Sequence, residues 1–205
     1  MRTRGRRLGA MLLILGLTTL LLPPSGASGD SAGESIGVSG HWVIEVRDPD
    51  GRLGERREFH NALHASNPIS QVLTSQRSAG AMEILLTCGS SSCAPPCGAA
   101  DCRIIEPRQG VAASTSVFKN LTVASVAGGF QLKGFAVVGA DAQIGFVATR
   151  MTTCLPTVAA ASCALSVGNA QIPTLTAAGL GSPVPVVAGQ QVLVTVTLGF
   201  ATAPQ

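Results

Sequence analysis

The stretch Gln191–Phe200, QVLVTVTLGF, has the most regular hydrophobic alternation in the chain. Its apolar residues at every second position are Val192, Val194, Val196, Leu198 and Phe200. In an extended strand these side chains share one face, and Thr195 and Thr197 share the other. A strand this regular is expected to be paired on both sides, with its apolar face against an opposing sheet. We therefore predict that it lies at the centre of a β-fold.

The same two-residue period occurs in several other stretches. Trp42, Ile44 and Val46 fall on one face of a predicted strand. The turn sequence at residues 48–51, DPDG, follows and predicts a hairpin. Further predicted strands are Met82–Thr87, Arg103–Glu106, Phe118–Val126, Phe130–Val138 and Gln143–Met151, with a loose region at 162–176. Short strands separated by glycine and proline turns predict an all-β fold, an antiparallel β-sandwich of about 7–9 strands. The expected large core residues are Trp42, Phe59, Phe118, Phe130, Phe135, Phe146 and Phe200.

One short helix is predicted after the hairpin. Asn67 can cap it and Pro68 suits its first turn. The apolar face would consist of Ile69, Val72 and Leu73. Arg77 would then lie in the last turn, and Gly80 could end the helix.

The N-terminus predicts export. Four arginines precede the largely apolar run Ala10–Leu22, and small residues follow at 25–27. This run is shorter than the about 20 residues that a membrane-spanning helix needs. We therefore predict a cleaved signal peptide at 1–27, a flexible lead-in at 28–40, and one β-sandwich domain at 41–205, with no membrane span after cleavage. Retention as an uncleaved anchor is the alternative. The expected location is extracellular or at the cell surface, or else the periplasm.

Export determines how the cysteines are interpreted. Four of them form two copies of a Cys-Gly-x-x-x-Cys unit, at 88–93 and 97–102. A zinc site is the alternative, but closely spaced cysteines in an exported chain are mostly oxidised to disulfides. The predicted disulfide residues are Cys88, Cys93, Cys97, Cys102, Cys154 and Cys163.

The pairing of these cysteines stays open, because six cysteines allow fifteen pairings. The repeated unit favours Cys88–Cys93 and Cys97–Cys102, with Cys154–Cys163 as the third bridge. The rival arrangement places Cys93–Cys97 inside Cys88–Cys102.

Charge and composition argue against nucleic acid as a partner. The formal net charge of the whole chain is +3, but the leader holds four of its fourteen basic residues. The remaining chain has ten basic and eleven acidic residues, so its charge is about −1. With no Tyr and one Trp, it also lacks the aromatic residues that stack on bases.

No catalytic, cofactor-binding or metal-binding residue is predicted. His60 and His64 have the spacing of two ligands on one helix face, but the glutamate of a metalloprotease helix is missing. We expect both histidines at a strand-to-loop corner. Asp48 and Asp50 could hold calcium, although such a turn is usually only a turn. A secreted hydrolase whose catalytic residues form no recognisable motif is the functional alternative.

The hairpin also carries a resemblance. Residues 42–51, WVIEVRDPDG, with 57–63, REFHNAL, resemble a pattern in poorly characterised bacterial exported β-rich proteins. Asn-Ala-Leu followed by a short helix, and a long alternating last strand, also resemble phage tail-associated β proteins. The resemblance implies a non-enzymatic module with a structural or adhesion role and implies no catalytic residue. Its expected partner is an extracellular protein or surface ligand, and self-association through an edge strand is a further option.

Overall fold

The computed structural model describes residues 36–62, 67–87, 102–107, 117–118, 120–164 and 168–202. Ten strands there form two five-stranded sheets. Sheet A consists of β1 (Ile36–Arg47), β2 (Leu53–Ala62), β6 (Thr122–Val126), β7 (Gly129–Val137) and β10 (Gln191–Thr202). Sheet B consists of β3 (Ser78–Thr87), β4 (Cys102–Ile105), β5 (Val117–Phe118), β8 (Ala142–Cys154) and β9 (Thr174–Val186). The helix is α1 (Asn67–Leu73), and a 3₁₀ turn covers Ala160–Ser162.

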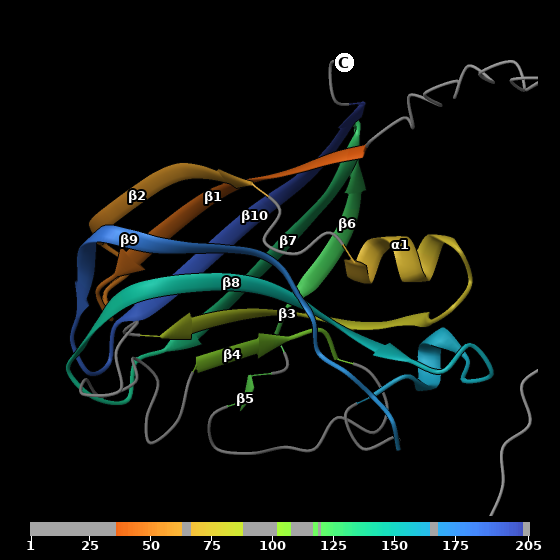
Figure 1. The fold of residues 1–205 in the computed structure, drawn as a ribbon. Helices are drawn as coiled ribbons and strands as arrows, with labels where there is room; N and C mark the ends of the chain where they lie inside the picture. The colour runs from red at the N-terminus through yellow and green to blue at the C-terminus, as the bar shows by residue number, and fades with distance from the viewer. Residues whose placement is uncertain are drawn as a thin grey trace, which may run out of the picture. The chain divides into compact units, whose positions relative to one another are not determined.

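The two sheets stack face to face, and α1 lies where they diverge (Figure 1). The strand orders are β2-β1-β10-β7-β6 in sheet A and β5-β4-β3-β8-β9 in sheet B. All neighbouring strands are antiparallel except β4 and β5, which are parallel. The predicted all-β sandwich with one short helix is confirmed.

The central position predicted for the last strand is also confirmed. β10 pairs with β1 on one side and with β7 on the other. Four of its apolar residues are each at most 1% exposed, namely Val192, Val194, Val196 and Leu198. Phe200, close to the end of the strand, is half-buried.

The core is more aliphatic than predicted. Trp42 is fully buried and stacks on the half-buried Phe59 with ring centroids 5.9 Å apart. Phe135, in contrast, is 43% exposed. The pleat of β7 is the reason: Leu132 and Ala136 face the core, so the odd-numbered Phe135 faces outward. The side chain of Phe118 lies outside the described residues.

The end of α1 differs from the prediction. The helix stops at Leu73, so neither Arg77 nor Gly80 belongs to its C-terminus. Ser75 instead adopts the left-handed conformation, with φ 58°. The Ser75 N–H donates to the Val72 carbonyl, and the Gln76 N–H donates to the Gln71 carbonyl. This is a Schellman motif closed by serine in place of the glycine that usually fills the position. Of the predicted apolar face, Leu73 is 65% exposed, while Ile69 and Val72 pack on the core.

Two predicted strand boundaries were wrong. The stretch 118–126 is split between β5 in sheet B and β6 in sheet A, because the fully buried Leu121 marks a crossing between the sheets. The predicted loose region at 162–176 includes the start of β9, which continues to Val186. Pro183 and Pro185 obscured this strand, yet proline is tolerated there because β9 is at the edge of its sheet.

The predicted lead-in at 28–40 was too long, since β1 begins at Ile36. Residues 36–40 show little hydrophobic alternation because they include two glycines and a serine, but their backbone pairs with β10 from Leu198 to Thr202. A Cβ at Gly40 would overlap the side-chain oxygen of Asn61, so a larger residue there would require the Asn61 side chain to move. The predicted signal peptide at 1–27 and the rest of the lead-in lie outside the described residues.

Candidate functional site

The predicted bridge Cys154–Cys163 is confirmed, with its Cα atoms 5.7 Å apart. Cys102 is disulfide-bonded as well. Its partner lies outside the described residues, as do Cys88, Cys93 and Cys97. The choice between the two pairing schemes for that stretch therefore stays a prediction.

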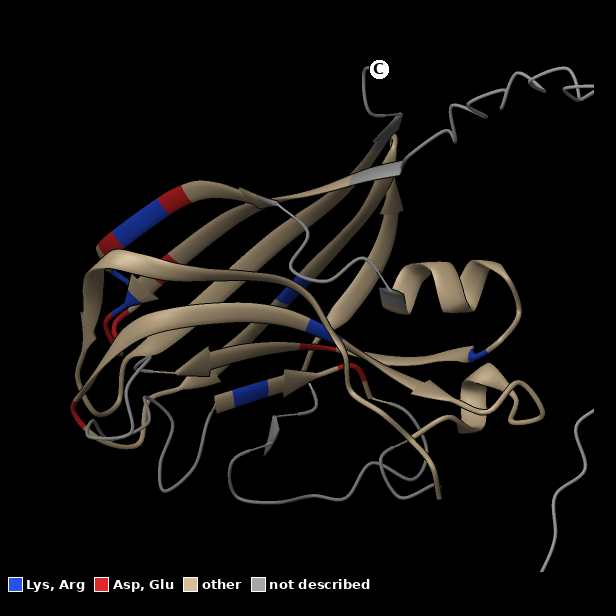
Figure 2. Ribbon diagram, viewed as in Figure 1, with Lys and Arg blue, Asp and Glu red and all other residues tan. Residues whose placement is uncertain are grey.

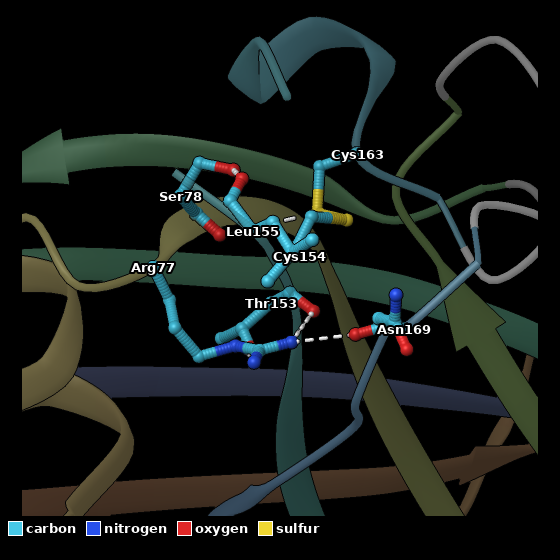
Figure 3. Close-up of a disulfide and its surroundings, with 7 residues drawn as sticks. All are labelled: Arg77, Ser78, Thr153, Cys154, Leu155, Cys163 and Asn169. Carbon is cyan, nitrogen blue, oxygen red and sulfur yellow. Dashed lines mark hydrogen bonds between the residues drawn. A yellow bond between two sulfur atoms is a disulfide. The ribbon is translucent and has the colours of Figure 1, made fainter. Parts of the chain in front are cut away.

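Arg77 reinforces the region of the Cys154–Cys163 bridge (Figure 3). Its guanidinium donates to the hydroxyl and the carbonyl of Thr153, at 3.0 Å each, and to the Asn169 carbonyl at 2.7 Å. The side chain thus connects the end of β8 with the turn at 168–169 that precedes β9. We conclude that bridge and arginine together have a structural role at this end of sheet B.

The structure describes only one of the two histidines that were predicted at a strand-to-loop corner. His60 lies within β2, opposite His41 on β1, and the two imidazoles stack with centroids 4.6 Å apart. His64 lies outside the described residues. His60 also lines a small cavity of about 320 Å³ together with Glu58 and Ser182. No hydrogen bond among the described residues joins these three side chains, so they do not form a catalytic triad in this structure.

The carboxylates of the hairpin turn are engaged by neighbouring side chains. Asp48 accepts hydrogen bonds from Arg52, at 2.7 and 3.1 Å, and from Gln190 at 2.9 Å. The bond from Gln190 and then that from Arg52 lower the pKa of Asp48 below its ordinary value. Asp50 accepts from the Arg52 N–H at 3.0 Å. Within the described residues, no cluster of three potential metal ligands occurs.

Charged residues concentrate on the β1–β2 hairpin (Figure 2). On its outer face, Glu58 contacts Arg56 at 2.6 Å and His41 at 2.8 Å. The bond from His41, followed by that from Arg56, lowers the pKa of Glu58. Because these groups neutralise one another, the hairpin has the character of a solvated face of mixed charge.

A buried ion cluster was missed from the sequence. Glu83 of β3 is 2% exposed, although its neighbours Met82 and Ile84 occupy the core side of the strand. Arg103 of β4 lies 2.5 Å from one carboxylate oxygen, and Arg150 of β8 contacts the other. The cluster therefore joins three adjacent strands of sheet B. Nothing in the local sequence distinguishes Glu83 from an exposed glutamate.

The most distinctive concave feature is an apolar cavity of about 550 Å³ between the two sheets. Sheet A contributes Val38, Val123, Ser125, Phe130, Leu198 and Phe200. Sheet B contributes Ala79, Gly80, Met82, Met151 and Leu175. Helix α1 contributes Ile69, Val72 and Leu73. We refer to this feature as the α1 cavity.

The lining of the α1 cavity contains no charged side chain, and Ser125 is its single hydroxyl-bearing residue. Its volume lies in the range of small-molecule sites, which are mostly apolar. Helix α1 lies where the sheets diverge, and its residues form one wall of the cavity. The sequence does not predict this cavity, because its walls come from eight separate elements.

Comparisons with known proteins add no name to this site. Neither the protein-family models nor the curated proteins nor the solved structures contain a match to the chain. Within the described part of the chain, no helix has the length and apolar character required to cross a membrane.

Proposed function

We propose that this chain is an exported, non-enzymatic β-sandwich module with a binding role at or outside a bacterial surface. The observation that carries the proposal is the α1 cavity, because it is apolar, has a volume of about 550 Å³ and is lined by both sheets and a helix. The arginine-rich leader supports export, as does the disulfide between Cys154 and Cys163. The resemblance to bacterial exported and phage tail-associated β proteins agrees with a non-enzymatic role.

The cavity proposal is tested with an uncharged environment-sensitive dye such as Nile red. We expect saturable binding with a blue-shifted emission. Val123→Trp should lower the dye affinity by about tenfold or more, because the indole would occupy the mouth of the cavity. Val123 is 38% exposed, so the larger side chain should be tolerated by the fold.

The matched control is Val137→Trp. Val137 is 44% exposed, lies on β7 and does not line the cavity. This variant should bind the dye like the parent. Dye binding that is absent from the parent, or that both variants reduce equally, would contradict the proposal.

A further inference from the structure

Strand β6 is an open edge beside the α1 cavity. It pairs with β7 from Thr122↔Lys133 to Val126↔Gly129. Among the described strands none pairs with its other side. Alternate backbone N–H and C=O groups of such an edge point away from the sheet and can pair with another segment.

The two other long edge strands, β2 and β9, carry features that oppose strand addition. On β2, Glu55 and Arg57 point toward the core side and form an ion pair at 2.8 Å. On β9, Pro183 and Pro185 interrupt the row of backbone donors. Charges pointing inward and prolines are two of the devices that protect sheet edges. β6, with the sequence TVASV, has neither, and its first four residues are exposed.

The open edge and the cavity are adjacent. Val123 and Ser125 of β6 face the core side and line the cavity. A strand added next to β6 would lie about 4.8 Å away and would continue the pleat. Every second side chain of the added strand would therefore point into the same apolar space.

We propose that the α1 cavity accepts an extended peptide segment that adds to β6 as a sixth strand of sheet A. The segment has apolar side chains at alternate positions, because the cavity lining is uncharged. Backbone pairing with the edge supplies affinity, and the cavity supplies side-chain selectivity. This inference rests on the proposed function, since it names the occupant of the same cavity.

Other occupants use only part of this site. A lipid chain would fill the cavity but leave the backbone groups of β6 unpaired. A second copy pairing through its own β6 would add side chains of Val123 and Ser125, which already line their own cavity. A contact between two five-residue strands is also far smaller than the about 1,200 Å² of a stable interface.

The test uses a synthetic peptide that alternates valine with threonine and has lysines at both ends for solubility. It should bind the parent protein, displace the dye, and protect amides of residues 122–126 from hydrogen exchange. A scrambled peptide of the same composition should bind at least about tenfold more weakly, because it loses the alternation.

The variant Ala124→Lys distinguishes strand pairing at the edge of β6 from binding in the α1 cavity. Ala124 is exposed, does not line the cavity, and pairs with Gln131. The added charge should weaken peptide binding by about tenfold or more and leave dye binding unchanged. Val137→Lys is the matched control and should change neither.

The other possible results would contradict strand addition, the apolar binding site or the identity of the occupant. If the dye binds and the peptide does not, strand addition is wrong while the apolar site stands. If neither binds, the proposed function fails too. Displacement of the dye by a neutral fatty-acid ester but not by the peptide would replace the peptide with a lipid. A dimer in sedimentation experiments that Ala124→Lys dissociates would replace it with a second copy.

Discussion

The two edges of sheet A differ in almost every property that governs strand pairing. β2 is ten residues long and contains two acidic and two basic residues, including the inward pair Glu55–Arg57. β6 is five residues long, uncharged and exposed on both faces. Charge closes one edge to further pairing, whereas the other edge is open beside an apolar cavity. With the proposed strand addition at β6, one sheet would combine protection against aggregation with a binding edge.

The comparison depends on a continuous sheet between the two edges, which Val196→Asp should destroy. Val196 is fully buried at the centre of β10. An unpaired carboxylate there should cost more than about 5 kcal/mol, which exceeds what a small domain can lose. We expect no soluble folded protein to accumulate.

Two controls place the same charge elsewhere in sheet A. Val123→Asp at the edge strand and Thr195→Asp on the outer face of β10 should each change the free energy of unfolding by about 1 kcal/mol or less. Denaturant titration measures both. If Val196→Asp folds and melts like the parent, β10 is not the central strand and the two edges do not belong to one sheet.

Sequence patterns predicted the centre of the fold better than its margins. The alternation in β10 and at Trp42 depends on burying one face of a strand, which is what the structure does with them. β9 escaped prediction because an edge strand tolerates proline. The end of α1 escaped because Ser75 occupies a left-handed position where glycine is usual. Local sequence patterns thus fail where the position of a residue in the fold permits a residue type that the pattern would exclude.

The candidate site was less predictable than the fold. The bonding of Cys102, Cys154 and Cys163 could be predicted, because closely spaced cysteines in a chain that is predicted to be exported favour disulfides. The burial of Glu83 depends on Arg103 and Arg150, which lie on two other strands. The α1 cavity likewise depends on how the sheets diverge, and no spacing within the chain encodes that angle.

The buried ion cluster of sheet B can be compared with the exposed ion pairs of β2, to test how burial changes the contribution of a charge to stability. Glu83→Ala should lower the free energy of unfolding by about 2–4 kcal/mol, because it leaves two partly buried guanidinium groups without their carboxylate. Chemical denaturation measures the change. The same substitution at Glu58, whose ion pairs are exposed, should have a much smaller effect. Equal losses at the two positions would contradict the distinction between buried and surface charge.

Removing the inward charges of β2 should make that edge resemble β6. In Glu55→Thr/Arg57→Thr the inward ion pair is replaced by neutral strand-forming side chains. We expect concentration-dependent self-association in light scattering, because a second edge becomes able to pair.

The matched control removes the ion pair Glu45–Arg47 from β1, which is an internal strand of the same sheet. Glu45→Thr/Arg47→Thr changes net charge equally but opens no edge, so it should stay monomeric. Association of both double variants would mean that lost surface charge, and not the exposed edge, is the cause.

The smallest predicted effect is the pH dependence that one carboxyl group of the charged edge contributes. Hydrogen bonds from His41 and Arg56 lower the pKa of Glu58 below its ordinary value of 4.5. A carboxyl group with a lowered pKa stabilises the folded state above its unfolded pKa, and this contribution is lost as the pH falls through the folded pKa. The difference in free energy of unfolding between the parent and Glu58→Gln should therefore be largest near neutral pH and shrink below about pH 4.5. β6 contains no titratable group, so Ala124→Gln should differ from the parent by the same amount throughout the titration. A Glu58→Gln difference that stays constant between about pH 7 and about pH 2 would show that the contacts of Glu58 do not stabilise β2.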